Sequence, residues 1–100
     1  MRIISKKPFR DFWEIHPESK SVLEDWLLKA TQMTAKSFSE VRQTFSSADY
    51  VDGFTIFDIG GNKYRIAAVI HYDKQRLYVR QVMTHSEYDR NYWRKNESRY

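Results

Sequence analysis

Apolar residues in the first third of the chain recur with the period of an α-helix. The first set stands at positions i, i+3, i+4 and i+7 and comprises Phe9, Phe12, Trp13 and His16. Pro8 suits the first turn of this helix, and Pro17 ends it. A second apolar stripe, flanked by charged residues, comprises Val22, Leu23, Trp26, Leu27 and Ala30. The two sets predict a helical hairpin.

The segments on either side of this hairpin carry shorter signals. Residues 2–5 are mostly β-branched or polar and predict a short strand before the helices. In residues 34–50 we expect Ser39 to cap a short helix from Glu40 to Thr44, with Val41 and Phe45 pointing inward.

The pattern changes to alternation from Phe54 onward. It predicts strands over residues 54–59, 63–72 and 76–83, joined by a turn at 60–62 and a loop at 73–75. Thr84 is expected to cap a last helix from His85 to about Tyr92, because Glu87 stands where a capping box requires it. The order of elements predicts an α+β fold, a small antiparallel sheet with the helices packed on one face.

Alternation also assigns the strand side chains to faces. On strand 63–72 the expected inward set is Tyr64, Ile66, Ala68, Ile70 and Tyr72. On strand 76–83 it is Leu77, Val79, Gln81 and Met83, in which only Gln81 is polar. If facing residues have numbers with an odd sum, Arg65 and Arg80 lie together on the open face as a cationic floor. The sequence leaves this register open, and a shift of one residue would reverse the faces.

Composition narrows the class of protein. A length of 100 residues fits one domain over 1–100. The net charge of +4 favours a polyanionic partner such as nucleic acid. The absence of cysteine excludes disulfides and thiolate metal sites, and the three histidines lack ligand spacing, so we expect no metal. We see no leader segment or membrane-spanning run and expect a cytoplasmic protein.

A cationic floor suits a scissile phosphate, because the Arg guanidinium matches two phosphate oxygens and stays charged. Cleavage of RNA without a metal needs a base for the 2′-hydroxyl proton, cations for the developing charge and an acid for the leaving oxygen. The 2′-hydroxyl is itself the nucleophile, so no cofactor is needed. His85 and Tyr88 stand at i and i+3 of the last helix and are candidates for proton transfer.

Each candidate also has a structural interpretation. Arg65 and Arg80 could be solvated strand residues, His85 a helix-terminal surface residue, and Tyr88 a core ring with its hydroxyl at the rim. The basic and aromatic segment 90–100 could hold RNA by charge and stacking or could be a frayed terminus. Composition and periodicity alone predict a basic α+β domain with a possible polyanion site.

Two motifs carry a more specific signal. Gly60-Gly61-Asn62 followed by Arg65, and then the run 84–89 that reads Thr-His-Ser-Glu-Tyr-Asp, resemble the HigB toxins of the RelE/ParE superfamily. The likeness extends more loosely over almost the whole chain. It implies a RelE-like fold and the toxin of a type II toxin-antitoxin system. It also implies a metal-independent endoribonuclease that cleaves mRNA, usually on translating ribosomes, and so inhibits translation and arrests growth.

The resemblance also implies partners and site residues. The partners are mRNA, the ribosome and a HigA-type helix-turn-helix antitoxin, through which operator DNA is bound. The implied catalytic residues are Arg65, Arg80, His85 and Tyr88, and Lys63 is the implied RNA-binding residue. The other candidate RNA-binding residues come from the strand faces and the basic end of the chain, namely Arg76, Tyr78, Arg90, Arg94 and Lys95. The general base stays open, with Glu87 and Asp89 as weak candidates.

Two other functions are compatible with the same sequence. A ParE-like protein would inhibit DNA gyrase by binding, with no chemistry. A regulatory nucleic-acid-binding module would leave growth unaffected when it is induced without its partner.

Overall fold

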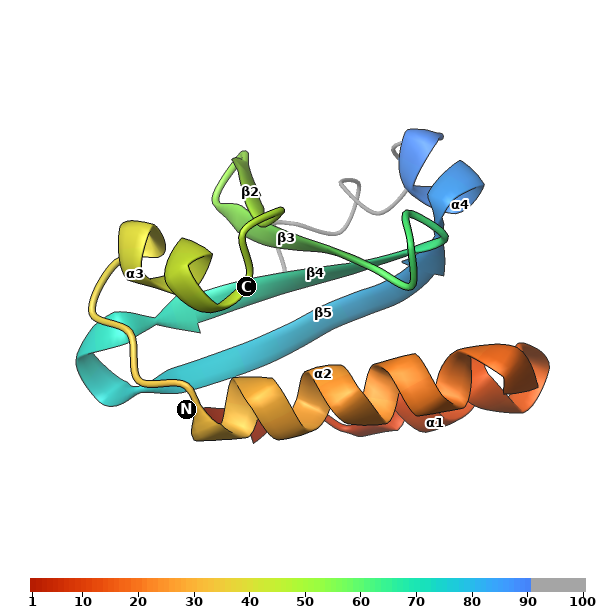
Figure 1. Ribbon diagram of the computed structural model, residues 1–100, viewed down its shortest axis with the longest axis horizontal. Coiled ribbons are helices and arrows are strands. Elements are labelled where there is room, and N and C mark those ends of the chain that lie inside the picture. Colours follow the sequence, from red (N-terminus) through yellow and green to blue (C-terminus); the bar gives the residue numbers. More distant parts are fainter. Residues whose placement is uncertain (91–100) are drawn as a thin grey trace.

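Five strands form one mixed sheet in the computed structural model, which describes residues 1–90 (Figure 1). The strand order is β1-β5-β4-β3-β2. Their bounds are β1 Arg2–Ile4, β2 Asp49–Val51, β3 Phe54–Ile59, β4 Tyr64–His71 and β5 Arg76–Thr84. Strand β1 pairs with β5 in parallel, and the other neighbours are antiparallel. The predicted α+β class is confirmed, while β2 and the parallel pairing were not predicted.

Helices α1 and α2 run side by side along one side of the sheet (Figure 1). The helical bounds are α1 Lys7–Ile15, α2 Lys20–Gln32, α3 Phe38–Thr44 and α4 His85–Asp89, with 3₁₀ turns η1 Pro17–Ser19 and η2 Tyr72–Lys74. The predicted helical hairpin is therefore confirmed, and Pro17 begins the turn between its helices. Within residues 1–90, no helix has the length and apolar character needed to cross a membrane.

The main core lies between α2, α3 and the sheet and is built around Trp26. The Trp26 ring stacks on Phe9 with a centroid distance of 5.6 Å and meets Phe57 edge-on at 5.0 Å. Phe45, which follows α3, lies 5.1 Å from Phe57 and completes the aromatic cluster. The residues expected to point inward from the predicted strand 63–72 all pack in or against this core, namely Tyr64, Ile66, Ala68, Ile70 and Tyr72.

Helix α3 begins earlier than the sequence analysis predicted. Ser37, and not Ser39, is its N-cap, because the Ser37 hydroxyl accepts a hydrogen bond from the Glu40 backbone N–H at 3.3 Å. Glu40 reaches back to accept from the Lys36 backbone N–H at 3.2 Å. These two contacts satisfy backbone N–H groups at the start of the helix and stabilise the earlier start. The inward positions of Val41 and Phe45 are confirmed.

A β-bulge interrupts the pairing of β4 with β5 between Ala67 and Ala68. Near the loop, Ala68 faces Val79, which is the odd-sum register that was hypothesised. Beyond the bulge Ala67 faces Gln81, so Arg80 is the extra residue on β5 and the register becomes even. This explains the polar Gln81, which lies opposite Ala67 instead of pointing into the main core. The bulge also reverses the faces expected for Val82 and Met83. Val82 packs in the main core, and Met83 packs in a second, smaller apolar cluster on the other face of the sheet.

The turn between β3 and β4 depends on two glycines with positive φ. Gly60 has φ +63°, and a Cβ there would lie 2.8 Å from Cδ2 of the Tyr64 ring. Gly61 has φ +61°, but a Cβ there would meet nothing within 4 Å. The two positions therefore share the backbone requirement and differ in the available space.

We expect Gly60→Ala to lower the free energy of unfolding more than Gly61→Ala does. Both substitutions force an L-residue into the left-handed region, which costs about 1–2 kcal/mol. Only Gly60→Ala also displaces the buried Tyr64 ring. Urea unfolding of the two variants measures the difference. Equal losses would contradict a close approach of Tyr64 to Gly60.

Candidate functional site

Arg65 is the centre of a polar cluster where β3, β4 and α4 meet. It is only 9% exposed, and its Nη1 donates to Asp58 Oδ1 at 3.0 Å. The same nitrogen lies 3.3 Å from the Asn62 carbonyl oxygen and 3.2 Å from the Tyr64 carbonyl oxygen. Nη2 contacts Asn62 Oδ1 at 2.6 Å and His85 Nδ1 at 3.0 Å. The terminal nitrogens of this guanidinium are thus engaged by protein acceptors.

These contacts overturn the hypothesis of an open cationic floor at Arg65. Asp58 lies directly opposite Arg65 in the antiparallel β3–β4 pair, so the two side chains share a face. The bulge on β5 places Arg65 opposite Met83. A buried, ion-paired guanidinium whose terminal N–H groups already have acceptors is not presented to a phosphate. Arg65 instead contacts Asp58, Asn62 and His85.

His85 lies at the first position of α4, beside Arg65. The predicted capping box is confirmed, because Thr84 Oγ1 accepts from the Glu87 N–H at 3.2 Å and Glu87 Oε1 accepts from the Thr84 N–H at 2.8 Å. The His85 backbone N–H also donates to the Lys63 carbonyl oxygen at 2.9 Å. The side chain is 46% exposed, and its Nε2 lies 3.0 Å from Asp89 Oδ2. The capping box and the backbone hydrogen bond to Lys63 thus determine the position of His85, with its imidazole partly exposed.

Tyr88 approaches Arg65 from the same helix. The Arg65 guanidinium carbon lies 5.5 Å from the centroid of the Tyr88 ring, within the range of a cation–π contact. The ring also packs on the second apolar cluster, which comprises Phe54, Ile56, Ala67 and Met83. The prediction that His85 and Tyr88 share one helical face is confirmed, since both contact Arg65.

Arg80 lies in different surroundings. Together with Gln81 it lines an open pocket of about 400 Å³ between β5 and α1, to which α4 contributes Glu87. The remaining lining residues are Pro8, Asp11, Phe12, Ile15, His16 and Val82. Arg80 is the extra residue of the β5 bulge, so the sheet register does not pair it with Arg65, whose facing residue is Met83.

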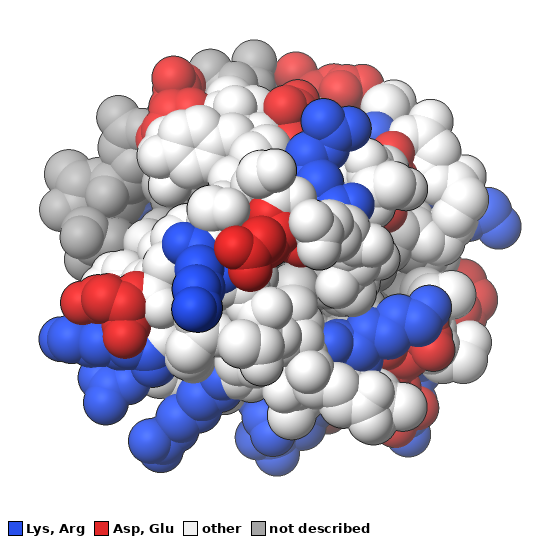
Figure 2. Space-filling view, turned by 60° about the vertical axis from the view of Figure 1, so that its left-hand side comes forward, with Lys and Arg blue, Asp and Glu red and all other residues white. Residues whose placement is uncertain are grey.

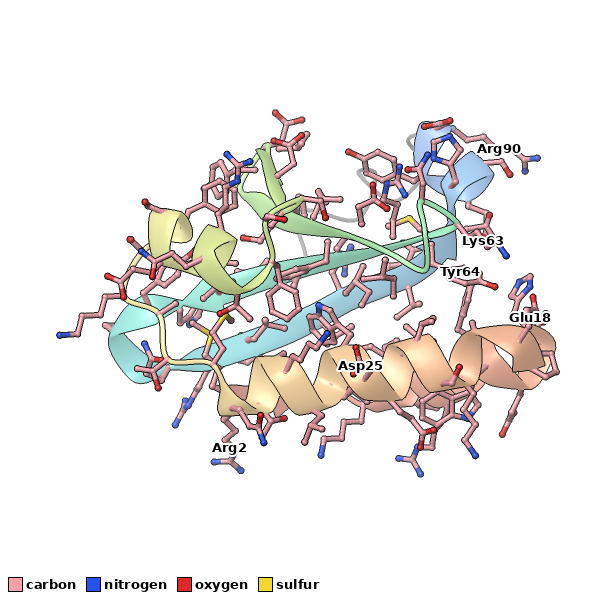
Figure 3. The ribbon with its side chains drawn as sticks, in the orientation of Figure 1. Arg2, Glu18, Asp25, Lys63, Tyr64 and Arg90 are labelled. Atoms are coloured by element: carbon pink, nitrogen blue, oxygen red, sulfur yellow. The ribbon has the colours of Figure 1, made fainter. Side chains whose placement is uncertain are left out.

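The other predicted RNA-binding residues fall into separate groups. Lys63 and Arg90 are exposed and lie at the end of the molecule that carries α4 (Figure 3). Tyr78 and Arg76 lie toward the opposite end of β5, about 20 Å and about 26 Å from Thr84 at the usual rise of a strand. Tyr78 contacts the His71 ring there at 4.9 Å. Arg94, Lys95 and the predicted end of the last helix lie outside the described residues.

The charged surface has a clear orientation in one view. Figure 2 shows Lys and Arg side chains gathered along the lower rim, which is the side of α1 and α2.

Among residues 1–90, no group of three or more His, Cys, Asp or Glu side chains is arranged to hold a metal ion.

Tyr64 precedes Arg65 on β4 and points to the opposite face of the sheet, toward the helices. Its hydroxyl lies 3.4 Å from Glu18 Oε1, and Figure 3 shows its ring pointing from the β3–β4 turn toward Glu18. Burial, and secondly the Glu18 carboxylate, raise the pKa of Tyr64 above its usual value. The phenol therefore stays a hydrogen-bond donor that ties this turn to the connection between α1 and α2.

Two contributors to the cluster were not found from the sequence. Asp58 and Asn62 hold the Arg65 guanidinium, but Asp58 was not singled out and Asn62 was named only as part of the turn and its motif. The signal was available for Asp58, because a turn at 60–62 brings the preceding strand back beside Arg65. Asp89 was only a weak candidate for a base, and the structure shows it in contact with His85.

Comparison with known proteins agrees with this architecture. Residues 19–91 match the model of the HigB_toxin family, described as the RelE-like toxic component of a toxin-antitoxin system. The mRNA interferase toxin HigB of Escherichia coli (strain K12) is 32% identical over 92 residues, covering 89% of this chain and 88% of that protein. The mRNA interferase HigB of Escherichia coli O6:H1 is 29% identical over 102 residues, covering 97% and 99%. The chain therefore belongs to the HigB family of RelE-like toxins.

Proposed function

We propose that this chain is an endoribonuclease that cleaves mRNA by attack of a 2′-hydroxyl on the adjacent phosphate. Relatives at 32% identity carry the name mRNA interferase, which supports the substrate class. The observation that carries the proposal for the site is the position of His85. Its half-exposed imidazole lies between the buried Arg65 guanidinium and the Asp89 carboxylate. Such a held imidazole suits acid–base work or orientation of a reacting group.

The proposed reaction needs no protein nucleophile. The 2′-oxygen loses its proton and bonds to phosphorus, while the bond from phosphorus to the 5′-oxygen breaks and that oxygen takes up a proton. The products are a 2′,3′-cyclic phosphate and a 5′-hydroxyl end. His85 and Tyr88 are the proposed groups for proton transfer or for orienting the 2′-hydroxyl. Exposed Lys63 is proposed to stabilise the negative charge that develops on the phosphate.

The basic residues outside this centre are proposed to bind and position the RNA. Arg90 follows α4 directly and would hold the backbone next to the reacting phosphate. Arg80, whose Nε and Nη2 are buried, would support RNA from beside the pocket between β5 and α1, where Gln81 adds an amide. Arg76 and Tyr78 would contact a more distant part of the message. Arg65 is proposed to act through His85, since its terminal N–H groups are engaged.

The proposed setting is a toxin-antitoxin system in the cytoplasm. Translating ribosomes would present the message. A HigA-type helix-turn-helix antitoxin would neutralise the enzyme and bind operator DNA with it. Membership of the HigB family supports an antitoxin partner of this kind.

Mapping of RNA 5′ ends tests this function directly. We expect induction without antitoxin to arrest growth and to create new 5′-hydroxyl ends inside the codons of a translated reporter message. A reporter with a mutated start codon is the matched control, and loss of the cuts there supports cleavage on the ribosome. Intact mRNA with an SOS response would instead support gyrase inhibition. Unaffected growth would support a regulatory binding module.

A further inference from the structure

We propose that Asp58 and Asn62 are positioning residues that act through Arg65 to hold His85 in a single tautomer, with its hydrogen on Nε2. The consequence for cleavage rests on the proposed ribonuclease function. The tautomer itself rests only on contacts within the protein.

The assignment follows from the chemistry of the Arg65–His85 contact. Arginine carries only hydrogen-bond donors and stays protonated in proteins. Its Nη2 lies 3.0 Å from His85 Nδ1, so Nδ1 must accept with its lone pair. A neutral imidazole with an unprotonated Nδ1 carries its hydrogen on Nε2. That hydrogen has an acceptor in place, because Asp89 Oδ2 lies 3.0 Å from Nε2.

Asp58 and Asn62 determine where the guanidinium points. Asp58, on the neighbouring strand, accepts from Nη1 at 3.0 Å. Asn62, in the turn, accepts from Nη2 at 2.6 Å. A planar guanidinium fixed at both terminal nitrogens has little freedom left. Its second contact from Nη2 is therefore directed at His85. The Asp58 side chain is 30% exposed, so this ion pair lies at the rim of the site and not in the deep core.

The arrangement sets what His85 can offer to RNA. Its Nδ1 lone pair is turned inward to Arg65, and its exposed side carries a hydrogen on Nε2. An RNA group that reaches Nε2 from solvent therefore meets a donor, for which it competes with Asp89 Oδ2. Without the hold on Arg65, the two tautomers would interchange and part of the protein would present a lone pair instead. Asp58 and Asn62 thus specify the role of His85 without touching the message.

Imidazole ¹⁵N NMR of the free protein tests the tautomer. Two-bond ¹H–¹⁵N spectra are recorded at neutral pH, and His85→Gln identifies the His85 signals among the three histidines. In the wild type we expect Nδ1 in the range of an unprotonated nitrogen and Nε2 in the range of a protonated one. In Asp58→Ala/Asn62→Ala we expect the two shifts to move toward each other.

Matched variants separate positioning from general destabilisation. Asp25→Ala removes the carboxylate of an exposed pair with Lys29 at 2.9 Å, and we expect it to keep the wild-type spectrum. Arg65→Lys retains the positive charge but offers one ammonium in place of a two-pronged donor, and we expect it to lose the tautomer. This variant keeps the test open if the double variant fails to fold. Wild-type His85 with averaged shifts or a protonated Nδ1 would overturn the proposal.

Cleavage assays then test the positioning role. We expect Asp58→Ala/Asn62→Ala to slow cleavage about 10²-fold, since a misdirected group at a reacting centre costs on this order. An unchanged rate despite a lost tautomer would overturn the role. If the wild-type protein shows the expected tautomer but cleaves no mRNA, the proposed ribonuclease function is wrong. The proposed tautomer of His85 is still supported in that case.

Discussion

His85→Ala is expected to lower the rate of mRNA cleavage by about 10²-fold or more and to abolish growth arrest. Loss of a proton-transfer group or of a single donor to developing charge costs at least this much. The side chain is 46% exposed, so its removal leaves the core intact. The position of α4 is kept by the Thr84–Glu87 capping box and by the His85 backbone contact to Lys63.

Single-turnover cleavage of a defined message, with wild type and variant at equal concentration, measures this effect. His71→Ala is the matched control, because His71 is also exposed but lies at the far end of β4, beside Tyr78. We expect the control to cleave at the wild-type rate. Equal rates for His85→Ala and wild type would remove His85 from the catalytic centre, whatever the growth phenotype.

Most helices and strands could be predicted because the residues within each element carry its pattern. Strand β3 was found at its observed bounds, since Phe54–Ile59 is an uninterrupted β-branched and aromatic run between turn residues. Helix α4 was placed by the capping box at Thr84 and Glu87. Strand β2 was missed because its residues are mostly exposed and it depends on pairing with β3. Tertiary pairing, not local pattern, makes Asp49–Val51 a strand.

The main error in the site arose from the register. A bulge of one residue on β5 has no local signature, apart from the polar Gln81 at an expected core position. The register predicted from alternation is correct near the loop. It fails beyond Val79, because Arg80 is an extra residue in β5. The register pairs Arg65 with Met83 and leaves Arg80 in the bulge, so alternation alone does not place the two arginines on one floor.

Arg65 illustrates the second limit of sequence analysis. Its residue type suggested a phosphate ligand, but the structure surrounds it with Asp58, Asn62 and His85. A charge read from a sequence has no partner until the strand pairing is known. Arg65, His85 and Tyr88, three residues that the motifs singled out, do lie together in the structure. Their proximity could thus be expected from the motifs, whereas the acceptors around Arg65 could not.

Trp26→Ala is expected to cause a large loss of stability, about 3–5 kcal/mol in the free energy of unfolding. The side chain is 2% exposed and contacts Phe9, Phe45 and Phe57, so alanine would leave a cavity between α2, α3 and β3. Small domains have only about 5–15 kcal/mol in total, and the variant would therefore be partly unfolded on mild heating.

Urea unfolding followed by circular dichroism measures the loss, with Trp26→Phe as the conservative comparison. The Trp26 Nε1 has no hydrogen-bond acceptor within residues 1–90, so phenylalanine retains an aromatic ring and removes a buried donor that gains nothing there. We expect Trp26→Phe to lose clearly less stability than Trp26→Ala. Trp13→Ala, at a partly buried ring beneath Lys20, is expected to lose less as well. Similar losses for all three variants would show that the aromatic cluster around Trp26 is not the centre of the core.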